Sequence, residues 1–199
     1  MTLTIESKSG EMDLIAKAIK GDESSFEALI LSCQKKAWNI AIQYMRNESD
    51  AMDVLQECFI KIFRNLKSFK GDSRFDTWVY RITVNTCKDF LRKSEKMKQN
   101  EFHFANNEED DYLRQIPSNE STPEEDMSKR ETAEELLKCM EMLPLDHREV
   151  IILRDIQNLS YDEISEILST SLGTVKSRIN RARISLKKIW LEQKRLENV

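Results

Sequence analysis

The sequence predicts an all-α protein, built from two small helical domains joined by a flexible acidic linker, with a helix-turn-helix in the C-terminal domain. Only four glycines and three prolines occur in 199 residues, too few for a turn-rich sandwich or barrel. Apolar residues recur at helical spacings, without strand-like alternation. Charged residues make up 33% of the chain and hydrophobic residues 40%, a balance typical of a globular protein with a charged surface.

The N-terminal domain is expected over residues 12–95. Gly21 ends a first short helix, and Asp22 or Ser24 can start the next. In the helix expected over residues 51–66, apolar side chains follow a 3.6-residue period. The other helices of this domain are expected over residues 26–46 and 76–93, with a turn at 47–50 and a loop at 68–73.

A flexible linker is expected over residues 96–130. It contains Pro117 and Pro123 and few aliphatic residues, and nine acids stand against one base between Glu101 and Asp126. Such a composition buries too little apolar surface to order the chain. The C-terminal domain is expected over residues 131–192, with helices at 131–142, 145–155, 161–168 and 172–196.

Basic residues gather in two blocks outside the linker. Residues 61–98 hold eleven bases and four acids, and residues 169–195 hold eight bases and one acid, although the net charge of the chain is -4. Residues 22–57 are instead acidic, with seven acids and three bases. Two basic blocks indicate two contacts with a polyanion. Ordinary solvated helix faces are the alternative.

Several functional classes are excluded by what the sequence lacks. The cysteines (Cys33, Cys58, Cys87 and Cys139) form no CxxC pair and are expected to be core residues in a reducing compartment. His103 and His147 are isolated, so no metal site is expected. No catalytic or phosphate-binding motif occurs, so we expect neither an enzyme nor a cofactor. The absence of a long apolar run or signal-like start favours a cytoplasmic protein without membrane insertion.

The C-terminal basic block has the pattern of a helix-turn-helix. Ser160 and Glu163 fit a capping box, and Ser171 can cap the following helix. An apolar stripe on that helix lies opposite a face of polar and basic side chains, which suits base edges and phosphates of DNA. The stripe comprises Val175, Ile179, Ala182 and Leu186. A plain basic surface helix is the alternative.

The N-terminal basic block combines a polar stripe with aromatic residues. Arg81, Asn85, Lys88 and Arg92 share one helix face, next to Trp78 and a glycine-containing loop. Basic and aromatic side chains together suit an opened DNA strand, because unpaired bases can stack. The alternative is that the aromatic residues belong to the core. We favour the core for Phe75 and Tyr80 and leave Trp78 open.

Three segments together resemble bacterial RNA polymerase sigma factors of the sigma-70 family, in the small extracytoplasmic-function (ECF) group. They are residues 50–59, 69–85 and 172–183. The resemblance covers residues 12–94 and 131–190, and the acidic linker has no counterpart that we can name. Two residues depart from the family pattern. Cys58 replaces a commoner alanine- or valine-like residue, and Ser171 stands where proline is frequent.

The resemblance implies an alternative sigma factor, which binds core RNA polymerase and directs transcription initiation at specific promoters. It assigns Asp53, Gln56, Glu57 and Phe59 to the clamp helices of core polymerase. The loop at 66–75 would take a flipped base of the single-stranded -10 element, and the helix from Leu172 would enter the major groove of the -35 duplex. The candidate -10 residues are Phe69, Lys70, Gly71, Asp72, Ser73, Trp78, Arg81, Asn85, Lys88 and Arg92. The candidate -35 residues are Ser171, Gly173, Thr174, Lys176, Ser177, Arg178, Asn180, Arg181 and Arg183.

Two further expectations concern partners. Sigma factors of this group usually pair with an anti-sigma factor, which is often membrane-anchored. The acidic linker would either mimic nucleic acid in the RNA path of the polymerase or serve as a soluble spacer. The rival interpretation of the whole chain is a helix-turn-helix regulator that does not join the polymerase.

Overall fold

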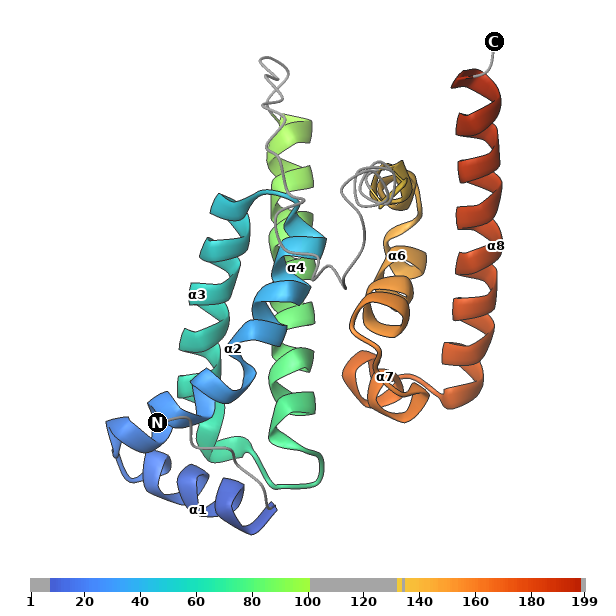
Figure 1. Ribbon diagram of the computed structural model, residues 1–199. Helices are drawn as coiled ribbons and strands as arrows, with labels where there is room; N and C mark the ends of the chain where they lie inside the picture. The colour runs from blue at the N-terminus through green and yellow to red at the C-terminus, as the bar shows by residue number, and fades with distance from the viewer. Residues whose placement is uncertain (1–7, 101–131, 134, 198–199) are drawn as a thin grey trace, which may run out of the picture. The chain divides into compact units, whose positions relative to one another are not determined.

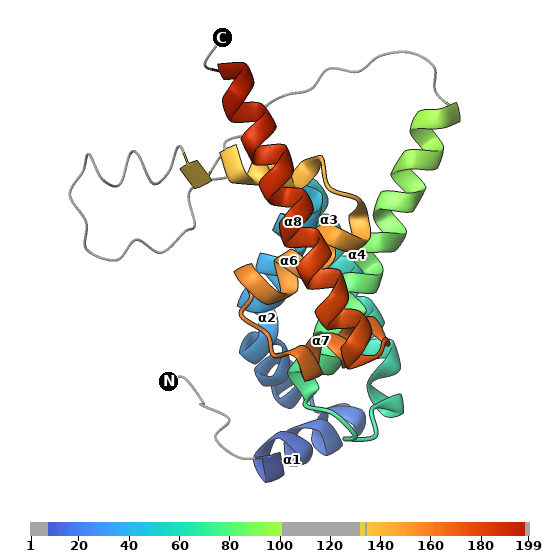
Figure 2. The same cartoon turned by 90° about the vertical axis from the view of Figure 1, so that its right-hand side faces the viewer.

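The computed structural model describes residues 8–100, 132–133 and 135–197, and all regular elements in these ranges are helical (Figures 1 and 2). The described residues form two compact units. The expectation of an all-α fold is therefore confirmed for this part of the chain. Within it, no helix has the length and hydropathy required to cross a membrane.

The N-terminal unit consists of α1 (Lys8–Ile19), α2 (Glu23–Met45), α3 (Glu48–Asn65), a 3-10 turn (Leu66–Ser68) and α4 (Phe75–Asn100). Helices α2, α3 and α4 pack on one another, and α1 crosses the end at which the loop between α3 and α4 lies (Figures 1 and 2). The core between them is aliphatic and contains three cysteines. Its fully buried members include Leu29, Cys33, Val54, Cys58, Ile62, Val79, Val84 and Cys87.

Short-range signals set the helix ends of this unit. Gly21 follows α1 in the left-handed conformation, with φ of +97°, which a residue with a side chain rarely adopts. Asn47 caps α3, because its side-chain oxygen accepts a hydrogen bond from the amide of Asp50 at 2.6 Å. Helix α4 extends past the expected end at residue 93, since residues 94–100 contain neither glycine nor proline.

Most of the expected acidic linker lies outside the described residues. Residues 96–100 belong to α4 and are helical, whereas residues 101–130, with the acidic run and His103, are not described.

The C-terminal unit begins with helical residues 132–133 and 135–141, followed by α6 (Leu145–Ile151), α7 (Tyr161–Leu168) and α8 (Leu172–Glu197). The helix expected over 145–155 is not uniform, because α6 passes into a π-helical turn over Ile152–Ile156. The turn closes through a backbone hydrogen bond of 2.9 Å from the amide of Gln157 to the carbonyl of Ile152, and the guanidinium of Arg154 donates to the carbonyl of Leu159 at 2.6 Å. The core of the unit includes Cys139, Val150, Ile152, Leu153, Ile164, Val175, Ile179 and Ala182.

The two caps expected in the helix-turn-helix are present. Glu163 accepts a hydrogen bond of 2.8 Å from the amide of Ser160, and the Ser160 hydroxyl accepts one of 3.2 Å from the amide of Glu163. The Ser171 hydroxyl accepts a hydrogen bond of 3.2 Å from the amide of Thr174 at the start of α8. Between the two helices, Ser169 adopts a left-handed conformation with φ of +50°, which makes the turn tight.

Candidate polymerase and nucleic-acid interfaces

The outward face of α3 carries acids and exposed apolar side chains together. Asp53 and Gln56 are exposed, and Phe59 is half-buried. Glu57 is half-buried as well and forms an ion pair with Lys61 at 3.0 Å. Asp53, Gln56 and Phe59 therefore point away from the core, on the side opposite the buried stripe of Val54, Cys58 and Ile62.

Sequence reasoning missed the apolar part of this face. Met52, Ile60 and Phe63 are 53%, 50% and 62% exposed, and they share the outward face of α3 with Gln56 and Phe59. A second apolar stripe at helical spacing, outside the buried one, was the signal that could have revealed them. We call these six residues (Met52, Asp53, Gln56, Phe59, Ile60 and Phe63) the α3 surface. Large exposed apolar side chains on one face are typical of a protein-binding site.

Three aromatic rings form a cluster where the loop at 69–74 meets α4. The centroid distances are 5.6 Å between Phe69 and Phe75, 5.4 Å between Phe69 and Trp78, and 5.7 Å between Phe75 and Trp78. Phe75 is fully buried and Tyr80 is 2% exposed, so both are core residues as expected. Trp78 and Phe69 are 7% and 9% exposed, and the structure thus places the indole mainly in the core.

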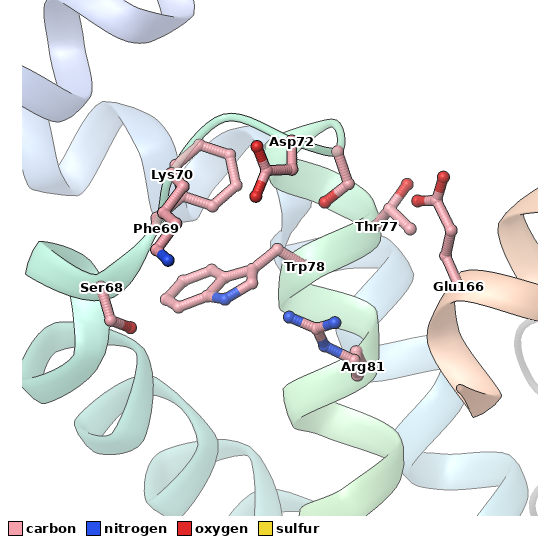
Figure 3. A pocket seen from close by; sticks show the side chains of 9 residues that line it. Ser68, Phe69, Lys70, Asp72, Thr77, Trp78, Arg81 and Glu166 are labelled. Carbon is pink, nitrogen blue, oxygen red and sulfur yellow. The ribbon is translucent and has the colours of Figure 1, made fainter.

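Polar and charged side chains surround this aromatic cluster (Figure 3). Figure 3 shows Phe69, Lys70 and Asp72 on the loop, and Trp78 and Arg81 on the first turns of α4. Gly71 has a φ of +77°, so the loop turns where only glycine is free of strain. Along α4, Asn85 and Arg92 are exposed and Lys88 is half-buried. The exposed and half-buried members of the expected -10 set therefore lie along the loop and on α4, whereas Phe69 and Trp78 are buried, and we call this set the α4 surface.

On α8, the buried and exposed sides separate as the sequence predicts. Val175, Ile179 and Ala182 are at most 2% exposed, whereas Leu186 is half-buried. The opposite side is solvated and polar. We call it the α8 surface, and its exposed members are Gly173, Lys176, Ser177, Asn180 and Arg181.

The arginines of α8 differ in their intramolecular contacts. Arg178 is half-buried, and its guanidinium lies 3.9 Å from the carboxylate of Asp146 and 4.0 Å from that of the buried Glu149. The Nε of Arg183 donates to Asp155 at 3.1 Å, and a second nitrogen of the same guanidinium also contacts that carboxylate. Among the described residues, the guanidinium of Arg181 contacts Ser177 of its own helix, with Nε 3.3 Å from the backbone oxygen, and no acidic side chain.

Comparison with known families assigns both units. A model of sigma-70 region 2 matches residues 29–97, and a model of sigma-70 region 4 matches residues 125–186. The chain is 39% identical over 174 residues to the ECF RNA polymerase sigma-E factor of Escherichia coli K12, with 85% of this chain and 88% of the relative covered. For the protein of the same name from Haemophilus influenzae the identity is 37%, with coverage of 85% and 89%.

Solved structures share the fold. The structure of CnrH in complex with the cytosolic domain of CnrY matches with a TM-score of 0.64 and 24% identity, covering 90% of this chain and 96% of that one. The sigma factor RpoE in complex with the anti-sigma factor NepR from Bartonella quintana also gives a TM-score of 0.64 and 24% identity, with coverage of 82% and 95%.

Regions 2 and 4 in this order define an RNA polymerase sigma factor. The chain belongs to the ECF group of the sigma-70 family, whose members bind RNA polymerase and direct initiation at specific promoters. The expected family and function are thereby confirmed, and the rival interpretation as a regulator that does not join the polymerase is the weaker one.

Proposed function

We propose that the three surfaces divide the work of this sigma factor. The α3 surface binds core RNA polymerase, the α4 surface takes the melted -10 strand, and the α8 surface reads the -35 element. The observation that carries this proposal is the contrast between surfaces. Exposed apolar residues and one exposed acid, Asp53, share the α3 surface. Bases and amides instead dominate the α8 surface and the α4 residues Arg81, Asn85, Lys88 and Arg92.

The chemistry of the α3 surface favours a protein partner over DNA. Asp53 would repel phosphates, so this face is unsuited to nucleic acid. Met52, Ile60 and Phe63 can desolvate against an apolar patch, and buried apolar contacts of this kind dominate protein interfaces. Charge complementarity with a basic partner would then raise the association rate. We assign this surface to the clamp helices of the polymerase, as expected from the family.

The polymerase assignment is tested by reversing one charge. Asp53→Lys is expected to weaken binding to core polymerase by about tenfold, because a rim charge pair and its steering are lost. The control is Glu27→Lys, which reverses an exposed acid on α2. Asp53 is preferred to Glu57, since Glu57 is already paired with Lys61. Affinity is measured by titration of fluorescently labelled core polymerase, with circular dichroism to confirm the fold. Unchanged affinity for Asp53→Lys would remove α3 from the interface.

The DNA assignments rest on exposure and hydrogen-bonding capacity. Asn85 is exposed on α4, and amide side chains can pair with base edges of an unstacked strand. Arg181 and Asn180 are exposed on α8, and arginine and asparagine pair with guanine and adenine in a major groove. Arg178 and Arg183 flank this face, where phosphate contacts are expected. Run-off transcription with core polymerase on a genomic library would give the promoter sequence that these residues read.

Three further features belong to the same proposal. An anti-sigma factor holds the protein inactive, and in this group such a factor is often membrane-anchored. The Bartonella quintana RpoE structure, which has the same fold, is a complex with the anti-sigma factor NepR. The chain acts in the cytoplasm, where the polymerase is, and has no catalytic activity of its own. Affinity purification from cells, followed by mass spectrometry, would identify the regulator. Recovery of polymerase subunits alone under non-inducing conditions would contradict this regulation.

A further inference from the structure

The first helix contacts the start of α4 across a long sequence separation. The Oε2 of Glu11 lies 3.5 Å from the backbone nitrogen of Phe75, which donates a hydrogen bond to it. Phe75 is the first residue of α4 and is fully buried in the aromatic cluster with Phe69 and Trp78. A carboxylate at this position satisfies an amide that has no partner within the helix and is attracted to the positive end of the helix dipole.

The neighbouring residue of α1 contacts the loop itself. The Sδ and Cε atoms of Met12 lie 3.4 Å from the position that a Cβ on Gly71 would occupy. The Met12 side chain therefore packs against the backbone of the loop at its tightest point, where φ is +77°. Glu11 and Met12 together contact both the middle of the loop and the residue that follows it.

The position of α1 is itself determined by packing. Ile15 and Ala18, on the side of α1 that faces α2, are 2% and 6% exposed. The opposite side is solvated, with Asp13 and Lys17 forming an exposed ion pair of 2.7 Å. Buried residues thus anchor α1 beside the loop between α3 and α4 (Figures 1 and 2), and α1 presents Glu11 and Met12 to that loop from a fixed position.

We propose that Glu11 and Met12 are positioning residues for promoter opening, which hold the loop at 69–74 and the aromatic cluster in the conformation that accepts the melted strand. They touch no DNA themselves. Their effect passes through Gly71 and Phe75 to Phe69, Lys70 and Trp78. This inference rests on the proposed role of the α4 surface and adds two residues of α1, Glu11 and Met12, to which the family resemblance assigned no role.

The test compares two variants of Glu11 with a matched control in holoenzyme. Glu11→Ala removes the hydrogen-bond acceptor, Glu11→Gln retains an acceptor without the charge, and Asp13→Ala removes the adjacent exposed acid. Glu11→Ala is expected to lower open-complex formation by about fivefold, the cost of one hydrogen bond. Glu11→Gln should restore most of the activity, and Asp13→Ala should behave as wild type. Permanganate reactivity of unpaired thymines reports opening.

A second measurement separates positioning from a general loss of structure. Holoenzyme is titrated with single-stranded oligonucleotides that carry the -10 element or single-base variants of it. Glu11→Ala and Met12→Ala should reduce the preference for the true element, with affinity for core polymerase unchanged. A loss of core binding in parallel with opening would show that α1 only supports the fold and would overturn the proposal.

The proposed function and this inference fail in different ways. If Asn85→Ala lowers opening while Glu11→Ala and Met12→Ala both open the promoter at the wild-type level, the positioning role is wrong and the α4 surface keeps its assignment. If Asn85→Ala also opens the promoter normally, the α4 surface itself does not take the strand, and the positioning role falls with it.

Discussion

No contact within the described part of the chain requires a glycine at position 173 of α8. A Cβ added there would meet only the Ser171 hydroxyl, at 3.9 Å, so no internal contact excludes a larger residue. Glycine within a helix costs about 0.5–1 kcal/mol relative to alanine. Since Gly173 lies on the α8 surface, we expect the absence of a side chain to let a DNA backbone approach closely.

Gly173→Ala is therefore expected to act on stability and on DNA binding in opposite directions. The melting temperature should rise, because the unfolded chain loses conformational freedom and the helix gains propensity. Binding of holoenzyme to the -35 element should weaken, since the new methyl group stands between α8 and the DNA. Thermal denaturation and a binding titration on the same preparations measure the two effects. A variant that is more stable and binds normally would place Gly173 outside the contact.

Arg181 is expected to determine base preference on α8. It lacks an acidic partner in the structure, and an arginine paired with a guanine edge contributes about 1–3 kcal/mol of discrimination against a wrong base. Arg181→Ala should therefore flatten the preference of holoenzyme among point variants of the -35 element. Competition binding to such a set measures this. Full retention of the preference would mean that another face of α8 enters the groove.

Arg183 provides the contrast, because its guanidinium is shared with Asp155. Arg183→Ala should weaken all -35 variants about equally and reduce the salt slope by about one unit, as expected for a lost phosphate contact. Asp155→Ala is the matched control, since it breaks the same ion pair but leaves the arginine. If both variants weaken binding equally, Arg183 acts by orienting α8 within its unit rather than by contacting DNA.

At the scale of elements, the loop at 69–74 and the stripe on α4 should act after polymerase binding. Asn85→Ala is expected to leave the affinity for core polymerase intact and to lower open-complex formation, because Asn85 is exposed and its loss removes only base-edge hydrogen bonds. Gln34→Ala, which removes an exposed amide on α2, is the control. Permanganate footprinting reports the unpaired thymines. Wild-type opening in Asn85→Ala would exclude the stripe from strand recognition.

Helix ends defined by neighbouring residues were predictable from the sequence. The left-handed Gly21, the capping box of Ser160 and Glu163 and the bounds of α7 all follow from interactions over a few positions. The π-helical turn at Ile152–Ile156 was not predictable, because no glycine, proline or capping motif within it marks a departure from the α-helix. Nor was the contact of Glu11 with Phe75, which joins residues 64 positions apart.

The candidate site was predictable where one helix carries the whole pattern. The exposed face of α8 follows from the 3.6-residue period, since the stripe of Val175, Ile179 and Ala182 is internal to the helix. Trp78 was not decidable in this way, because its burial depends on rings from the preceding loop. The exposed Met52, Ile60 and Phe63 were missed because only the one apolar stripe of α3 that is buried was followed in the sequence, and the apolar residues outside it were not considered.

At the scale of the whole molecule, the proposal gives the acidic helices to the polymerase and the basic helix α8 to DNA. The acidic N-terminal helices and the basic C-terminal helix lie in separate units, within a chain of net charge -4. When the chain is not bound to the polymerase, its acidic residues repel the phosphates of DNA. When these acidic residues contact a basic partner, this repulsion is removed. Promoter binding by the isolated chain should therefore be weaker and more salt-sensitive than binding by holoenzyme.

The cysteines of the N-terminal unit have a consequence for measuring its dynamics. Cys33, Cys58 and Cys87 are fully buried, and burial raises the pKa of the Cys33 thiol to about 12 and that of Cys58 to about 11. Because the thiolate is the reactive form, all three should react with thiol reagents only when the helices separate. Labelling of the native protein should thus be far slower than that of the denatured chain.

The reactivity of these thiols reports how often the N-terminal unit opens transiently. The reaction rate with an aromatic disulfide, followed by absorbance, measures how often α2, α3 and α4 part. A partner that stabilises the closed unit, whether polymerase or an anti-sigma factor, should slow this reaction, and the tighter it binds the slower the reaction should be. The measurement requires no label on the protein or on the partner. While the unit stays closed, the three buried thiols are also protected from oxidants, so their oxidation should depend on the same separation of the helices.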